Sequence, residues 1–231
     1  MAFGKQSGNS DAEVPVEPVA WATVREFVIG SVERPLTPKR KRVVRGPRAV
    51  RVPKGGKDSR VLAPCAFLGR SDHAGLPSRP ELTLYEDIEG RSLLCYVDSP
   101  KDVDGEQHHV VHDRQGQVIG TIRRVPPKRP FKHTWRMDQP GHPEIAGRNE
   151  WASGDAKEVA GRAAGKFALG VVGAIANLGA EGGDQRSKPR SLEWRADDKV
   201  VMVSEGSEKV TVRADWLDRR LAFAFALVSD Q

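Results

Sequence analysis

Residues 215–231 read DWLDRRLAFAFALVSDQ and contain the segment that decides the fold. Every residue from Leu221 to Val228 is apolar, and Asp215 is placed to cap a helix, with Asp218 three residues later. A helix that is apolar on all sides must be enclosed by protein or lipid, and eight residues span only about 12 Å, too little for a bilayer. We therefore expect a core helix over residues 216–229, enclosed by the rest of the protein.

Short strand patterns precede this helix. Residues 108–112 and 117–123 flank a DRQG turn, and residues 134–137 and 143–147 flank a DQPG turn, so both pairs predict hairpins. The remaining strand patterns cover residues 82–86, 92–98, 191–196, 200–204 and 208–213. Many short strands at close spacing are typical of an all-β barrel or sandwich.

Three pieces of sequence resemble the tubby-like superfamily: the ending WLDRRLAFAFALVSDQ (216–231), the hairpin VVHDRQGQVIGTIRR (110–124) and the hairpin KHTWRMDQPG (132–141). In that superfamily, phospholipid scramblases, LURP-one-related proteins and the tubby domain share a β-barrel around a hydrophobic C-terminal helix. The resemblance implies a mainly β fold, an antiparallel β-barrel enclosing the last helix, and lipid contact as in some relatives. The alternative is a β-sandwich in which residues 221–228 form a final buried strand.

Composition divides the chain into four parts. Residues 1–18 predict a disordered tail, and residues 19–33 a short apolar element. Residues 34–60 contain eleven basic residues and one acidic residue, which indicates a basic linker or arm. Residues 61–231 are expected to form the barrel domain, with an Ala- and Gly-rich helical insertion over 155–178. A linker adds little to stability, so removing residues 1–60 should leave the thermal midpoint nearly unchanged.

Basic residues in the arm repeat at every third position: Arg42, Arg45, Arg48, Arg51, Lys54, Lys57 and Arg60. In a polyproline II helix all seven would lie on one edge, about 9 Å apart, and could follow a line of phosphates. The alternatives are a solvated linker whose spacing is accidental and an arm that lies on an acidic surface of the barrel itself. A second candidate anion- or lipid-binding group lies between the two hairpins, where a plain exposed loop is the alternative: Arg123, Arg124, Lys128, Arg129 and Lys132.

No residue pattern predicts catalysis. His108 and His112 share one face of a strand while His109 points away, and no carboxylate or cysteine completes a metal site at a recognisable spacing. Cys65 and Cys95 show no catalytic signature, and we expect both to be buried free thiols in a reducing cytoplasm. We therefore expect no catalytic residue, metal or cofactor.

Net charge points to anionic partners. The formal charge is +6 and the pI is about 9.5. Our leading hypothesis is a cytoplasmic, non-enzymatic binding or scaffold module, peripheral to an anionic membrane surface. The alternatives are a nucleic-acid-binding protein that uses residues 34–60, and a structural subunit in which that arm and the helix over 155–178 both dock on assembly partners or on a second copy. That helix could also enter a membrane interface.

Overall fold

The computed structural model describes residues 15–69, 80–126, 134–149, 191–206 and 209–229, which form thirteen strands and one helix. The elements are β1 (Glu26–Arg34), β2 (Val44–Lys54), β3 (Val61–Leu68), β4 (Leu82–Tyr85), β5 (Leu93–Val97), β6 (Lys101–Val103), β7 (Glu106–Asp113), β8 (Val118–Val125), β9 (Thr134–Asp138), β10 (Ile145–Asn149), β11 (Ser191–Ala196), β12 (Lys199–Glu205), β13 (Lys209–Val212) and α2 (Arg219–Val228). Most of the expected tail and the whole expected helix over 155–178 lie outside the described residues.

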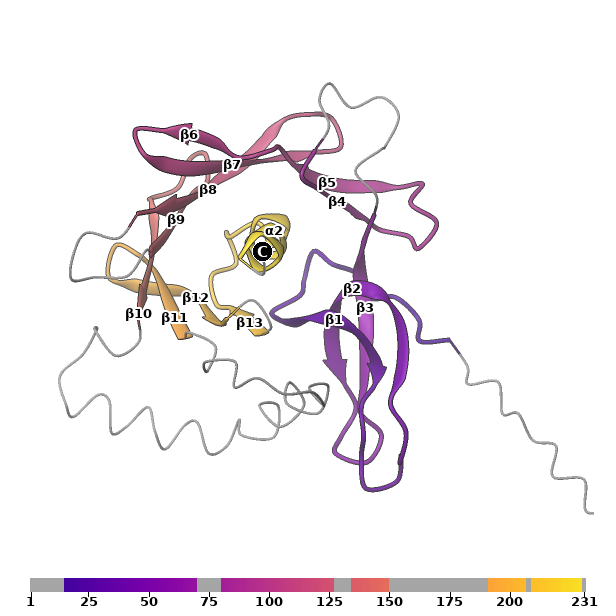
Figure 1. Ribbon diagram of the computed structural model, residues 1–231. Coiled ribbons are helices and arrows are strands. Elements are labelled where there is room, and N and C mark those ends of the chain that lie inside the picture. Colours follow the sequence, from indigo (N-terminus) through magenta and orange to yellow (C-terminus); the bar gives the residue numbers. More distant parts are fainter. Residues whose placement is uncertain (1–14, 70–79, 127–133, 150–190, 207–208, 230–231) are drawn as a thin grey trace, which may run out of the picture.

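Twelve of these strands form a closed antiparallel barrel. Each strand from β1 to β5, and from β7 to β13, pairs with its neighbour in sequence. Two further pairings, β1 with β13 and β5 with β7, close the ring. The short strand β6 also pairs with β7, at the beginning of β7, whereas β5 pairs with the end of β7. Figure 1 looks down the barrel and shows α2 end-on at its centre.

Helix α2 is enclosed on all sides, as the apolar sequence predicts. Nine of its ten residues are buried. The ring of Phe223 meets that of Phe27 edge to face with centroids 4.8 Å apart, and Phe225 contacts Trp135 and Trp194 in the same manner, at 5.7 and 4.5 Å. The predicted barrel around a C-terminal helix is therefore confirmed, and the sandwich with a final strand is wrong.

The start of the helix differs from the prediction. The first helical residue is Arg219, and the carboxylate of Asp218 caps the helix by accepting a hydrogen bond from the Arg220 amide at 2.8 Å. The side chain of Gln139 fixes the turn before it, because it donates to the Trp216 carbonyl and accepts from the Asp218 amide, both at 2.9 Å. The predicted cap Asp215 lies outside the helix as a consequence.

Both predicted hairpins are present. In the turn between β7 and β8 the Asp113 carboxylate accepts hydrogen bonds from the amides of Gln115 and Gln117, both at 2.9 Å. Gly116 and Gly141 end the two turns with φ of 78°, a conformation that favours glycine. The strands predicted between residues 82 and 98 and between 191 and 213 are also confirmed, with small changes at their ends.

The barrel begins earlier than residue 61. The expected apolar element over 19–33 contains most of β1, and the expected linker over 34–60 contains β2, which pairs with both β1 and β3. The linker prediction is therefore wrong. The basic composition indicated a linker because β2 exposes polar side chains over its first half, although it is a barrel strand. We now expect removal of residues 1–60 to open the barrel.

Candidate functional site: a basic lobe

Strands β1, β2 and β3 continue beyond the barrel wall and form a projection (Figure 1). Register shifts interrupt the pairing of β1 with β2 after Gly30 and that of β2 with β3 at Arg51. Such irregularities bend strands, which explains why these three leave the curve of the barrel. We call residues 34–60 the basic lobe; it consists of the last residue of β1, the strand β2 and the loops 35–43 and 55–60 on either side of β2.

Hydrogen bonds join the two loops of the basic lobe. The Thr37 hydroxyl donates to the Asp58 carbonyl at 3.1 Å, and the Arg40 guanidinium donates to the Arg60 carbonyl at 2.8 Å. Within the first loop, Arg40 also donates to the Pro35 carbonyl at 3.2 Å, and its amide donates to the Thr37 hydroxyl at 2.9 Å. The two loops therefore present one continuous surface.

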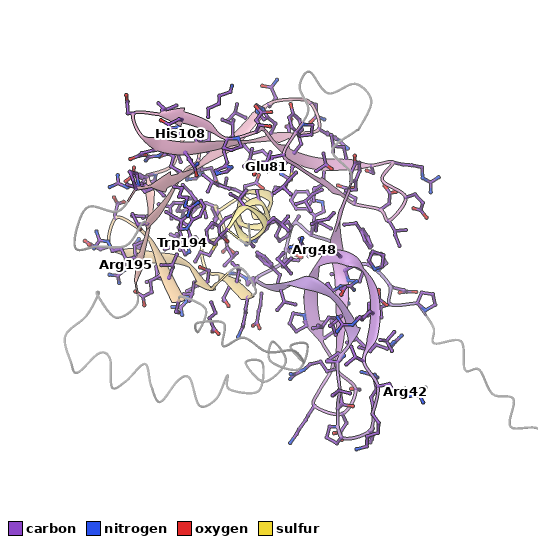
Figure 2. All side chains as sticks on the ribbon, in the orientation of Figure 1. Arg42, Arg48, Glu81, His108, Trp194 and Arg195 are labelled. Carbon is purple, nitrogen blue, oxygen red and sulfur yellow. The ribbon has the colours of Figure 1, made fainter. Side chains whose placement is uncertain are left out.

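Positive charge dominates this surface. The exposed basic residues of the lobe are Lys39, Lys41, Arg42, Arg45, Arg48, Lys54 and Lys57. Asp58 is the one acidic residue of the lobe, and it is exposed. Figure 2 places Arg42 far out on the projection and Arg48 close to the barrel. Cations at this density create a local positive potential that attracts anionic partners.

Arg51 does not belong to the exposed charges. Its side chain is 0% exposed and donates to the carbonyls of Gly30, Leu62 and Pro47 at 2.9, 3.0 and 2.6 Å. It also pairs with Glu33 at 3.3 Å. Burial lowers the pKa of the Arg51 guanidinium, and the Glu33 carboxylate opposes that shift. Arg51 therefore holds the base of the lobe together.

The predicted single edge of seven cations is consequently wrong. It requires a polyproline II arm, whereas residues 44–54 form a strand, in which successive side chains alternate between two faces. Arg51 is turned inward, while Arg45 and Arg48 remain exposed. The predicted residues are distributed over two loops and a strand: Arg51 is buried, Arg60 is half-buried, and the other five are exposed.

The second predicted basic group does not form one patch within the described residues. Arg123 donates to Asp138 at 2.6 Å and to Glu106 at 2.9 Å, and it also pairs with Glu144. Burial lowers the pKa of Arg123, but these three carboxylates outweigh that effect and raise it above its usual value. Arg124 lies over the Trp135 ring. The other members, Lys128, Arg129 and Lys132, lie outside the described residues.

The histidines of β7 take different directions, as predicted. His109 is buried, with its Nδ1 atom 2.9 Å from Glu81, whereas His108 and His112 lie on the other face of the strand. His112 contacts Asp98 at 3.0 Å. Figure 2 labels His108 on the outer part of the barrel wall. Over the described part of the chain, no three His, Cys, Asp or Glu side chains are grouped so as to hold a metal ion.

Both cysteines are free and buried, as predicted. Burial raises the pKa of Cys65 to about 12 and that of Cys95 to about 12. A thiol is nucleophilic only as the thiolate, so these side chains are poorly suited to nucleophilic chemistry.

Comparison with protein-family models, with curated proteins and with solved structures gives no match. The barrel around a C-terminal helix is the arrangement that the resemblance to the tubby-like superfamily implies. None of the helices in the described ranges has the length and apolar character needed to cross a membrane.

Sequence reasoning identified the cations of the lobe but missed Leu36, whose side chain lies exposed beside them. A leucine within a basic loop gives no signal of its exposure in the sequence.

Proposed function

We propose that this chain is a tubby-like binding module that associates with an anionic membrane surface through its basic lobe. The resemblance supports the class of protein, since the barrel and its enclosed helix have the expected arrangement and some relatives contact lipid. The fold alone does not determine the function, so the proposal rests on the charge of the basic lobe.

The observation that supports the proposal is the charge of the two joined loops. Lys39, Lys41, Arg42 and Lys57 are exposed there, with Asp58 as the one acidic residue. A basic residue near an anionic membrane contributes about 1 kcal/mol of attraction. Four such residues together would favour an anionic over a neutral membrane by roughly a thousandfold.

A membrane fits the lobe better than nucleic acid does. Residues 34–60 contain no aromatic side chain, so the lobe has nothing on which bases could stack. The two loops also lie on a projection from the barrel, and a projection contacts a broad surface more readily than it follows a single strand (Figure 1).

Sedimentation with vesicles tests the proposal. The full chain is mixed with phosphatidylcholine vesicles, with vesicles that also contain phosphatidylserine, and with double-stranded DNA in a parallel shift assay at the same salt concentrations. We expect binding to the anionic vesicles that weakens as salt is added, and little binding to the neutral ones. Equal binding to both vesicles would contradict the proposal, and tighter binding to DNA would favour the nucleic-acid alternative.

A further inference from the structure

An exposed leucine lies among the cations of the basic lobe. Leu36 is 37% exposed, in the loop that also contains Lys39, Lys41 and Arg42. The other large exposed hydrophobic residues of the described ranges lie in or beside β4–β8, outside the lobe: Ile88, Val103 and Val118. Leu36 therefore combines exposure with a basic surrounding.

Two hydrogen bonds direct polar side chains of this loop to the second loop. The Thr37 hydroxyl and the Arg40 guanidinium are both directed to carbonyls of the second loop, Asp58 and Arg60. Pro35 is buried beside Leu36. Two polar side chains of this loop thus bond to the neighbouring loop, while its leucine remains exposed.

We propose that Leu36 enters the acyl region of an anionic bilayer, while the neighbouring Lys39, Lys41 and Arg42 contact lipid phosphates. The inference rests on the proposed function and adds an apolar anchor to it. Water is a poor solvent for an exposed leucine and the acyl region a good one, whereas the cations remain at the headgroups. A soluble polyanion offers the same phosphate chemistry but no apolar phase.

Substitution of Leu36 separates the two kinds of contact. The full chain with Leu36→Ser should bind vesicles of phosphatidylcholine and phosphatidylserine about tenfold more weakly, since the burial of one leucine is lost. Its binding to inorganic polyphosphate should be unchanged. The matched control is Ile88→Ser, because Ile88 is 57% exposed in the turn between β4 and β5, and it should leave both affinities unchanged.

Labelling gives a second measurement of insertion. The native thiols are buried, and burial raises the pKa of Cys65 and Cys95 to about 12, so a thiol-reactive dye should label Leu36→Cys selectively. We expect the dye at residue 36 to shift to the blue on anionic vesicles and to be quenched by spin-labelled acyl chains. The same dye on Ile88→Cys should show neither effect.

The outcomes are distinguishable. If the unaltered protein fails to bind anionic vesicles, both the proposed function and the insertion of Leu36 are wrong. If it binds, but Leu36→Ser binds equally well and the dye remains unshifted, the insertion is wrong while the electrostatic function stands. An equal loss of polyphosphate binding in Leu36→Ser would also overturn the anchor, because it would show that the substitution disturbs the cations.

Discussion

The guanidinium of Arg51 lies 3.3 Å from the carboxylate of Glu33, fully buried at the base of the basic lobe. The same guanidinium donates to three backbone carbonyls from β1, β2 and β3. One side chain thus joins the three strands that leave the barrel, and it sets the position from which the exposed cations project.

Replacing Arg51 with alanine should destabilise the protein by about 3 kcal/mol, because it leaves three backbone carbonyls and the half-buried Glu33 carboxylate without this donor. Urea unfolding measures the change. Lys54→Ala removes an exposed cation from the same strand and should change stability by less than about 0.5 kcal/mol. Equal stability of the two variants would show that Arg51 has no structural role.

The sequence predicted the later part of the barrel and failed on its first three strands. The hairpin around Asp113 has apolar and polar residues in alternation and a glycine-terminated turn, both of which are local signals. In β3 residues on both faces are buried, so alternation is lost, and in β2 register shifts interrupt it.

The candidate site was predictable in composition but not in arrangement. Basic residues between 34 and 60 are evident from the sequence. Their gathering on two joined loops depends on the contact of Thr37 with Asp58, which lie 21 residues apart. Contacts over such separations follow from the fold of the whole lobe and leave no periodic signal.

The helix cap provides a test of two similar carboxylates. Asp218→Ala should destabilise the protein by about 1 kcal/mol, since the helix loses its cap at Arg220. Asp215→Ala should have a smaller effect, because Asp215 is exposed and pairs with the exposed Arg25. Thermal unfolding compares the variants. A larger loss of stability in Asp215→Ala than in Asp218→Ala would mean that Asp215 caps the helix, as the sequence predicted.

Because both thiols are buried, a thiol reagent should modify them slowly in the folded state. At pH 8, Cys65 and Cys95 should react with a thiol reagent far more slowly than a free thiol, and at the ordinary rate once urea has unfolded the chain. With a reagent that releases an absorbing group when it reacts with a thiol, the absorbance measures how many thiols have been modified. Rapid modification of either thiol in the native protein would mean that the barrel opens readily.

The same thiols predict that stability declines at alkaline pH. Burial raises each folded pKa from 9.0 to about 12, so the folded state holds protons that the unfolded state releases in this range. Their contribution is complete below pH 9.0 and is lost as pH rises toward 12. Unfolding free energies from pH 8 to 11 should decline less steeply in the Cys65→Ala, Cys95→Ala double variant. An identical decline in both proteins would rule out this contribution.

The enclosure of α2 makes its smallest residues as sensitive as its largest. Ala224 and Phe225 are both buried, so Ala224→Lys should place a charge in a close-packed space and unfold the barrel nearly as fully as Phe225→Asp. Arg220, the least buried residue of the helix, offers a control, and Arg220→Lys should stay folded. Circular dichroism and solubility report the result. A soluble, natively folded Ala224→Lys protein would contradict the enclosed helix.

The role of the basic lobe is tested by neutralising it without changing the rest of the barrel. The lobe variant replaces Lys41, Arg42 and Lys57 with glutamine. The control variant removes the same three units of charge from exposed residues of the barrel, namely Lys101, Arg114 and Lys199. Both variants should unfold at the same temperature as the unaltered protein, because the six side chains are all exposed.

The most direct measurement is the affinity of these two variants for vesicles of phosphatidylcholine and phosphatidylserine, determined by sedimentation. Three lost cations at about 1 kcal/mol each should weaken the binding of the lobe variant by roughly a hundredfold, while the control variant binds nearly as tightly as the unaltered protein. Equal losses in both variants would mean that net charge alone drives association and that the lobe is no binding site. No loss in the lobe variant would contradict the proposed function.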